Sequence, residues 1–424
     1  MRWLGRGRST PQSTVTCGEG NGADHYYVEV SEPASHHAPD ISTWMRPDAI
    51  LLHIGVHKTG TTAIQSALAQ AKDQLTAAGI LYPAPRSHFD TGMAALGRQA
   101  GWDRRDEPRD RSRWVDVAKR ARRHEDRVLF SSEVLCEADD EMARRIVEEL
   151  GTERVQVLIT LRPLEALLPS TWQQYLKSGY ALPYRRWLRR VLKSMDSSTT
   201  RSFWRRNDHG RLVERWGALV GADNVAVLVV DPLDRFGLYR DFERILDLPE
   251  GALVPAAPTP GNRSLSAAEA EALRLFNKRM RDEMPYAAYH RLIRRGAALT
   301  LVEGRKPDLE EPTIMTPPWA VERAREYGRA SVERILASGS PVFGSMDLLT
   351  PTHEVPQPER PDTNSIPVDI APLLLEGAVR ASLGQKFGGA EPTASSSGLT
   401  MVSWRSLAGE LAGRARRRVR RATK

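Results

Sequence analysis

One short stretch of the sequence gathers the residue types that bind anions. Residues 53–62 read HIGVHKTGTT and contain two glycines, one lysine and three threonines: Gly55, Gly60, Lys58, Thr59, Thr61 and Thr62. Glycine lets the backbone turn sharply and approach a ligand closely. A lysine ammonium supplies positive charge, and threonine hydroxyls supply hydrogen-bond donors. The stretch is therefore predicted to bind a phosphate or a similar anion.

The residues on either side of this stretch predict a buried strand before it and a helix after it. Residues 50–52 form an apolar run, and apolar residues then recur at helical spacing at Ile64, Ala67, Leu68, Ala71 and Leu75. A helix that starts after the loop points its unpaired N–H groups and the positive end of its dipole into the loop. This arrangement binds anions. The alternative is a solvated turn that only caps the helix.

The order of the loop residues distinguishes two kinds of phosphate-binding loop. In the loop of nucleotide triphosphatases, G-x-x-x-x-G-K-[ST], the lysine follows the second glycine. Here Lys58 precedes Gly60 by two residues, and two threonines follow the glycine. This order resembles the 5′-phosphosulfate loop of sulfotransferases that use 3′-phosphoadenosine 5′-phosphosulfate (PAPS). The resemblance implies that PAPS is bound by Lys58, Thr59, Gly60, Thr61 and Thr62.

Apolar runs alternate with helical patterns along the first half of the chain. Further strands are expected at 128–130, 155–161 and 225–230, and helices at 114–124, 140–150, 212–220 and 239–246. Another helix is expected to carry Trp172, Tyr175 and Leu176 and to stop at Gly179. This alternation predicts an α/β fold, a three-layer sandwich with a central parallel sheet. Ligands bind to such sheets outside the carboxyl ends of the strands. The polar residues at the four strand ends, 55–62, 131–133, Arg162 and Asp231, are therefore expected to converge on one cleft.

Arg162 is the second candidate for binding a phosphate, because its planar guanidinium matches phosphate oxygens. Ser170 follows eight residues later. This spacing resembles the segment of sulfotransferases that binds the 3′-phosphate of PAPS. Two features depart from the family pattern: Pro163 follows Arg162 directly, and Pro169 precedes Ser170, where it can kink the helix or mark its start. The alternative for Arg162 is an ion pair at the strand end.

The resemblance to bacterial-type sulfotransferases covers residues 49–248 and resumes weakly at 262–266. It implies in-line transfer of a sulfuryl group, which needs a base for the acceptor proton and a cation beside the leaving phosphate. Lys58 suits the second role. The resemblance implies Glu133 as the base, and His57 is the second candidate for this role. The alternative for Glu133 is a structural ion pair. No metal is expected, since the sequence has no H-E-x-x-H motif or cysteine cluster.

Several other side chains near these elements have two interpretations. His53 lies within a strand, which favours a packed core histidine over a catalytic one. Trp172 and Tyr175 are three residues apart on one helix, which favours core packing over stacking on adenine. The segment of Trp204 with Arg201, Arg205 and Arg206 either lines the acceptor side of the site or forms a solvated basic face.

Composition predicts one large folded domain with less regular segments at both ends. Residues 1–48 are expected to be disordered, 49–350 to form the sulfotransferase domain, and 351–398 to be a Pro/Gly-rich linker with a possible helix at 370–383. Within the domain, 86–113 is expected to be a poorly ordered or lid-like connection. The helices expected at 267–281 and 319–337 would pack around the sheet and close the acceptor pocket.

The formal net charge of +8 is concentrated at the end of the chain. Residues 405–424 contain eight Arg or Lys residues and one Glu, a net charge of +7. Apolar residues at four-residue steps, Leu407, Leu411, Ala415 and Val419, predict a basic amphipathic helix over 404–424 that contacts an anionic membrane surface. A disordered basic tail is the alternative, and no nucleic-acid partner is expected.

No apolar run approaches the ~20 residues that span a bilayer, and the sequence shows no secretory signal. The two cysteines, Cys17 and Cys136, have no metal-binding spacing, and together these features predict a cytoplasmic protein. The basic segment 404–424 adds the expectation of peripheral contact with the inner face of the membrane. Two other function classes stay open. One is a kinase or nucleotide triphosphatase, and the other is a nucleotide-binding protein that has lost catalysis. The acceptor is expected to be a carbohydrate, a lipid or a small metabolite.

Overall fold

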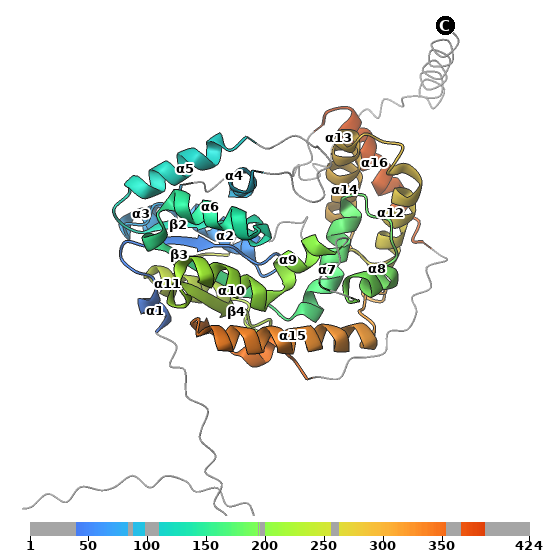
Figure 1. The fold of residues 1–424 in the computed structure, drawn as a ribbon. Helices are drawn as coiled ribbons and strands as arrows, with labels where there is room; N and C mark the ends of the chain where they lie inside the picture. Colours follow the sequence, from blue (N-terminus) through green and yellow to red (C-terminus); the bar gives the residue numbers. More distant parts are fainter. Residues whose placement is uncertain are drawn as a thin grey trace, which may run out of the picture.

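The computed structural model describes residues 40–83, 88–97, 110–193, 195, 200–255, 263–352 and 366–385. Its centre is a five-stranded sheet in which all strand pairs are parallel, in the order β2-β1-β3-β4-β5 (Figure 1). The strands are β1 Ile50–His53, β2 Val128–Ser131, β3 Val155–Leu161, β4 Val225–Val229 and β5 Val342–Phe343. The predicted α/β fold with a central parallel sheet is confirmed, and the two-residue strand β5 is an addition to the prediction.

Helices cover both faces of this sheet, because successive strand residues point to opposite faces. On one face, Ile50 and Leu52 pack with Trp114, Ile146 and Trp216. The helices of this layer are α4 His88–Leu96, α5 Ser112–Arg123, α6 Asp140–Leu150 and α10 His209–Val220. On the other face, Leu51 packs in a second cluster with Ile64, Leu68 and Phe242. That layer contains α1 Ile41–Trp44, α2 Thr61–Gln70, α3 Lys72–Ala77 and α11 Gly237–Leu246.

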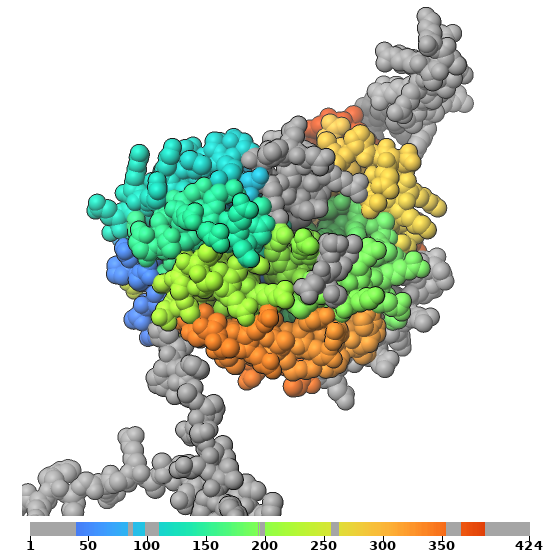
Figure 2. All heavy atoms as spheres, viewed as in Figure 1, coloured from blue at the N-terminus to red at the C-terminus, as the bar shows by residue number. Residues whose placement is uncertain are grey.

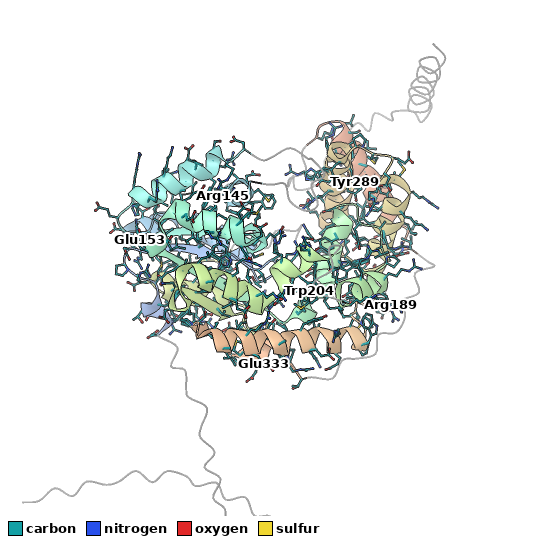
Figure 3. The ribbon with its side chains drawn as sticks, viewed as in Figure 1. Arg145, Glu153, Arg189, Trp204, Tyr289 and Glu333 are labelled. Carbon is teal, nitrogen blue, oxygen red and sulfur yellow. The ribbon has the colours of Figure 1, made fainter. Side chains whose placement is uncertain are left out.

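A third hydrophobic cluster lies beside the sheet and is made of helices and the segments that connect them. Its helices are α7 Leu164–Lys177, α8 Tyr184–Val191, α9 Arg201–Asn207, α12 Ala267–Met280, α13 Tyr286–Tyr289, the π-helical η5 His290–Ala297, α14 Ala298–Gly304, α15 Pro318–Ser338 and α16 Ile370–Ser382. Figure 1 shows this helical layer on the right, and Figure 3 places Tyr289 within it. The long helix α15 packs against both α7 and α10, and Figure 2 shows it along one side of the molecule in orange. It therefore joins the sheet layer to the helical layer.

Short helical turns complete the described fold. They are η1 Glu133–Glu137, η2 Thr152–Arg154, η3 Ala222–Asn224 and η6 Met346–Leu349. Of these, η1 directly follows β2 and is mostly buried, so its side chains are held at the carboxyl end of the sheet. None of the described helices is long and apolar enough to cross a bilayer.

Several sequence-based boundaries need correction. The prediction of disorder to residue 48 is wrong for residues 41–48, because α1 buries Ile41 and Trp44 against the sheet layer. The single helix expected after the loop is split at Ala71 into α2 and α3. The connection expected at 86–113 contains α4, which is buried along most of its length.

Other expectations about segments have mixed outcomes. The helix with Trp172 starts at Leu164 and holds Pro169 in its interior, so Pro169 does not mark its start. The helix expected at 370–383 is observed as α16, packed on η5 and α14. The predicted disorder of residues 1–39 and the basic tail at 404–424 lie outside the described residues, and the division into domains stays a prediction.

Candidate functional site

The loop between β1 and α2 has the backbone conformation that its glycines predict. Gly55, Lys58 and Gly60 have φ values of +85°, +71° and +88°, in the left-handed region. Backbone hydrogen bonds fix the loop to β3: the Val56 N–H donates to Thr160 O at 2.8 Å, and the Thr160 N–H donates to Gly55 O at 2.6 Å. The loop is therefore an extension of the sheet with a defined shape.

The N-terminus of α2 faces this loop without a side-chain cap. Gly60 is the N-cap residue, and it makes no side-chain hydrogen bond to the helix. The first N–H groups of a helix have no partner within the helix itself, so they need a cap, water or a ligand. Together with the helix dipole, these N–H groups favour a bound anion.

The loop borders a cavity of about 450 Å³, which we call the loop cavity. This volume is within the usual range for small-molecule sites, roughly 300–1,000 Å³. Six of the sequence-predicted residues line it: His57, Lys58, Gly60, Thr61, Thr62 and Glu133. The other lining residues come from α2, α4, the α7 region, α9 and η5: Ala63, Phe89, Thr171, Gln174, Tyr175, Ser178, Arg206, Asn207 and Arg294. The cavity therefore has one wall from the sheet ends and one from the helical layer.

Positive charge is concentrated around the loop cavity. Desolvation lowers the pKa of Lys58; Glu133 raises it, and Arg294 lowers it further. Burial, with the charges of Lys58, Arg263 and Arg294, lowers the pKa of Lys177 to about 8, although Glu269 opposes this. Burial is the largest cause of both shifts, and the smaller contributions of the neighbouring cations show that Lys58, Lys177, Arg263 and Arg294 are close enough to interact. Such a cluster is suited to a polyanion.

Sequence reasoning missed Lys177 and Arg294. Arg294 lies on η5 and donates from Nη1 to the Ser178 hydroxyl at 3.2 Å. Lys177 is the last residue of α7. π-Helical turns are uncommon and occur often at functional sites. A helical pattern with scattered basic residues gives no local sign that one arginine points to a loop about 230 residues earlier.

Glu133 is held against the loop by packing and by a hydrogen bond. The Gln65 amide donates from Nε2 to Glu133 Oε2 at 2.9 Å. A Cβ on Gly55 would lie 2.8 Å from Glu133 Cβ, so only glycine allows this close approach. Burial raises the pKa of Glu133, but the His57 charge and the Gln65 hydrogen bond lower it more, so that its net pKa lies below the ordinary value. Glu133 is therefore ionised at neutral pH and can accept a proton.

A chain of buried hydrogen bonds lies beneath the loop and explains His53. Its Nδ1 is 2.8 Å from Ser131 Oγ, and its Nε2 is 3.2 Å from Thr160 Oγ1. Gln65 Nε2 also reaches Ser131 Oγ at 3.3 Å, which connects the chain to Glu133. Burial lowers the pKa of His53 to about 4, so the ring is neutral. His53 is the packed core histidine that its position in a strand predicts.

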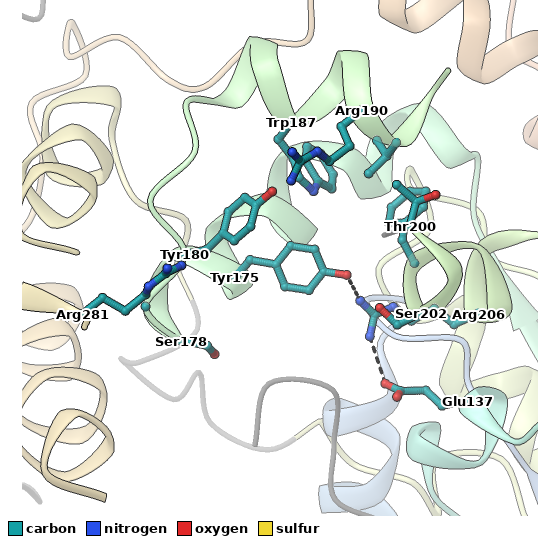
Figure 4. Close-up of a pocket in the computed structure, with 13 residues that line it drawn as sticks. Glu137, Tyr175, Ser178, Tyr180, Trp187, Arg190, Thr200, Ser202, Arg206 and Arg281 are labelled. Atoms are coloured by element: carbon teal, nitrogen blue, oxygen red, sulfur yellow. Dashed lines mark hydrogen bonds and ion pairs between the residues drawn. The ribbon is translucent and has the colours of Figure 1, made fainter. Parts of the chain in front are cut away.

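His57 faces a carboxylate that sequence reasoning did not select. Its Nε2 lies 3.3 Å from Glu137 Oε1, and the same oxygen accepts from Arg206 Nη1 at 2.9 Å. Arg206 also donates to the Tyr175 hydroxyl, and Figure 4 shows this chain from Tyr175 through Arg206 to Glu137. Arg206 is therefore a buried, paired arginine, and the interpretation of it as part of a solvated basic face is wrong. Glu137 was overlooked because it lies on a short buried turn without a recognisable motif.

The structure does not bring four predicted residues into the loop cavity with the rest. Arg162 contacts the loop, donating from Nη1 to Lys58 O at 3.3 Å, but does not line the cavity. The Ser170 hydroxyl donates to Leu167 O within its own helix at 3.0 Å.

The Thr59 hydroxyl is buried, donates to Val56 O at 2.7 Å, and lies 2.6 Å from Thr160 Oγ1. Asp231 is exposed and accepts from the Leu233 N–H at 2.8 Å. The convergence of strand ends on one cavity therefore holds for the loop and Glu133. Arg162 contacts the loop without lining the cavity, and Asp231 does not line it either.

A second cavity, of about 220 Å³, lies next to the loop cavity, and we call it the aromatic cavity. The two cavities share Tyr175, Ser178 and Arg206. The aromatic cavity is also lined by Tyr180, Trp187, Phe203, Arg190 and Arg281, among others. Trp172 does not line either cavity; it is buried against Tyr184, with a ring-centroid distance of 5.2 Å. Core packing is therefore correct for Trp172, whereas Tyr175 lines both cavities.

Among the described residues, no group of three or more His, Cys, Asp or Glu side chains is arranged to hold a metal ion. The arrangement instead joins backbone N–H groups, cations and an ionised carboxylate in one cavity. Such a site can bind a phosphorylated ligand and remove a proton from a second one.

The sequence matches no protein-family profile and no curated protein. Among solved structures, the fold is similar to a crystal structure titled as a sulfotransferase from Alicyclobacillus acidocaldarius, at 16% sequence identity and a TM-score of 0.35. The similarity covers 58% of this chain and 99% of that chain.

Proposed function

We propose that this protein transfers the sulfuryl group of PAPS to an oxygen or nitrogen of a small-molecule or glycan acceptor. The observation that carries the proposal is the set of groups that line the loop cavity. It combines an uncapped helix N-terminus, the cations Lys58 and Arg294, and the ionised carboxylate of Glu133. A doubly phosphorylated donor needs the first two features, and an acceptor that loses a proton needs the third.

The reaction proceeds in line at sulfur. The acceptor oxygen forms a bond to sulfur as the bond between sulfur and the 5′-phosphate oxygen breaks, and the acceptor proton moves to the base. We assign this proton to Glu133, which keeps its charge because His57 and Gln65 stabilise it. The leaving 5′-phosphate gains negative charge, which Lys58 and the N–H groups of Thr61 and Thr62 stabilise.

The 3′-phosphate needs a cation of its own, and more cations are available for this role than the resemblance implies. Arg162 remains a candidate because it contacts the loop. Arg294 and Lys177 are the additional candidates, since Arg294 lines the cavity and the charge of Lys177 interacts with that of Lys58. We assign Arg294 to the donor and retain Arg162 as a support of the Lys58 backbone.

A calorimetric titration of the full chain tests the proposal. 3′-Phosphoadenosine 5′-phosphate (PAP), the product of transfer, should bind, and Mg-ATP should bind at least tenfold more weakly. Lys58→Ala should abolish PAP binding, whereas Lys72→Ala, an exposed lysine on α3, should leave it unchanged. Equal binding of Mg-ATP would favour the kinase or nucleotide triphosphatase alternative, and no PAP binding would reject the proposal.

A further inference from the structure

The aromatic cavity has a composition that differs from that of the loop cavity. Four aromatic side chains line it: Tyr175, Tyr180, Trp187 and Phe203. Tyr175 and Trp187 meet edge to face, with centroids 6.0 Å apart, and Trp187 meets Phe203 in the same way at 5.6 Å. Aromatic side chains in such arrangements offer further edges and faces to a planar ring. The shape and chemistry of this wall favour a ring over an extended chain.

Positive charge surrounds this aromatic wall. Three arginines line the cavity, Arg190, Arg206 and Arg281, and the only carboxylate among its described lining residues is Glu137. Glu137 is already bound to Arg206. Figure 4 shows Arg281 and Arg206 on opposite sides of Tyr175, with Arg190 beside Trp187. The remaining cations, Arg190 and Arg281, therefore create a positive field that a bound carboxylate or phosphate would neutralise.

Neither arginine is engaged in a buried ion pair. Arg190 is exposed on α8 and hydrogen-bonds the Tyr180 hydroxyl. Arg281 follows α12 and pairs with Asp282, whose side chain is 74% exposed. Exposed pairs of this kind contribute little to stability, so either guanidinium can turn to a ligand at a small cost.

The described polar groups of the cavity argue against an uncharged sugar. A sugar exposes many hydroxyls, each of which loses free energy when it is buried without a partner. The uncharged polar side chains among the described lining residues are hydroxyls only, those of Ser178, Thr200, Ser202 and the two tyrosines. None of the described lining residues carries a side-chain amide. An aromatic ring with one acidic group needs fewer partners, and the wall supplies them.

We infer that the aromatic cavity binds the acceptor, and that this acceptor is an aromatic hydroxyl compound that carries an acidic group. Arg190 and Arg281 determine this specificity by binding the acid, while the ring packs among the aromatic side chains. This inference rests on the proposed function, because the acceptor hydroxyl must reach the loop cavity next door. The phenolic oxygen then forms the bond to sulfur, its proton moves to Glu133, and the bond from sulfur to the 5′-phosphate breaks.

A matched pair of probes tests the inference on the full chain. 4-Hydroxyphenylacetate and tyramine share a phenol ring and differ in the charge of the side group. We expect 4-hydroxyphenylacetate to bind at least tenfold more tightly in calorimetry, with and without PAP. The double variant R190Q/R281Q should lose this preference. R189Q is the matched control, because Arg189 is exposed on the same helix but does not line the cavity, and Figure 3 shows it at the edge of the helical layer.

The outcomes separate this inference from the proposed function. If PAP binds but tyramine binds as well as the acid, the acceptor class is wrong and the donor assignment stands. The same conclusion follows if R189Q removes the preference as fully as R190Q/R281Q does. If PAP does not bind but the acid still binds through Arg190 and Arg281, the cavity specificity stands and sulfuryl transfer is rejected. The single variant R190Q, at an exposed position, replaces the double variant if the latter does not fold, and should lose most of the preference.

Discussion

The two walls of the loop cavity are built in different ways. The wall from the sheet ends consists of a backbone loop that is hydrogen-bonded to β3, with Glu133 packed against Gly55. The wall from the helical layer is formed by side chains, among them the long side chains of Arg206 from α9 and Arg294 from η5. The first wall fixes atoms in place, and the second mainly supplies charge. Apart from Lys58, which binds the donor directly, we therefore expect substitutions in the sheet wall to alter turnover and substitutions in the helical wall to alter affinity.

The largest effect is expected for the base in the sheet wall. Glu133→Gln should reduce kcat by about a thousandfold, within the range for loss of a general base. PAP affinity should stay within threefold, because the amide keeps the shape of the side chain and the contact with Gln65. Steady-state sulfuryl transfer and calorimetry measure the two quantities, and Glu148→Gln, an exposed glutamate on α6, is the control.

The pH dependence identifies the base independently. The pKa of Glu133 lies below its ordinary value of 4.5, so this carboxylate is ionised at all higher pH values. If Glu133 is the base, kcat/KM should decline only as the pH falls below about 4.5. A decline that begins near neutral pH, where histidines ordinarily titrate, would assign the role to His57 instead.

The next effect concerns the close approach of the loop to Glu133. Gly55→Ala forces a left-handed φ of +85° on alanine and places its Cβ 2.8 Å from Glu133 Cβ. Gly251→Ala imposes a similar φ of +79° but has no neighbour within 4 Å. Gly55→Ala should therefore lower the free energy of unfolding by about 2 kcal/mol more than Gly251→Ala, the typical cost of overpacking. Equal losses in urea unfolding would mean that the loop is not fixed against Glu133.

A comparable effect is expected for the buried histidine beneath the loop. Burial lowers the pKa of His53 to about 4 from an ordinary 6.5. The stability that this neutral histidine contributes is complete above the unfolded-state pKa and is lost as the pH falls toward the folded-state value. Between pH 7.5 and pH 5 the loss is about 2 kcal/mol. His53→Gln should remove about this much of the pH dependence in urea unfolding.

His209, the first residue of α10, is the natural comparison for His53, because burial lowers its pKa to about 4 as well. His209→Gln should remove a similar part of the pH dependence. An unchanged pH dependence in both variants would show that neither ring is kept neutral by burial.

The smallest effect is expected in the helical wall. Arg294→Gln should weaken PAP binding roughly tenfold, the usual cost of losing one hydrogen bond to a charged group. The kcat at saturating PAPS should change less than threefold. Arg295→Gln is the matched control, since Arg295 is the next residue on the same helix and is exposed. A large loss of kcat in Arg294→Gln would contradict the division of roles between the two walls.

The same contrast explains what could be predicted from the sequence. The sheet wall is encoded locally: an apolar run, a glycine-bearing loop and a helical pattern follow one another within about 25 residues, and each has a recognisable period. The four longer strands and the position of Glu133 were predicted for the same reason. Strand β5 has only two residues, too few to show a period, and it pairs with β4 from more than 100 residues away.

The helical wall could not be predicted because its signals are not local. Arg294 and Lys177 belong to helices with several basic residues, and only tertiary packing determines which of these face the loop. Glu137 and Arg206 pair across about 70 residues, in a buried contact that no motif marks. Arg162 and Ser170 have the expected types and spacing, yet Ser170 bonds to its own helix. Binding of the 3′-phosphate by that segment therefore stays a prediction from residue spacing.

The central claim is that the β1–α2 loop binds the 5′-phosphate end of the donor. A crystal structure of the full chain with PAP tests it most directly. The 5′-phosphate should lie against Lys58 and the N–H groups of Thr61 and Thr62, with the 3′-phosphate beside Arg294. A PAP molecule bound elsewhere, with its phosphates away from Lys58, would contradict the account.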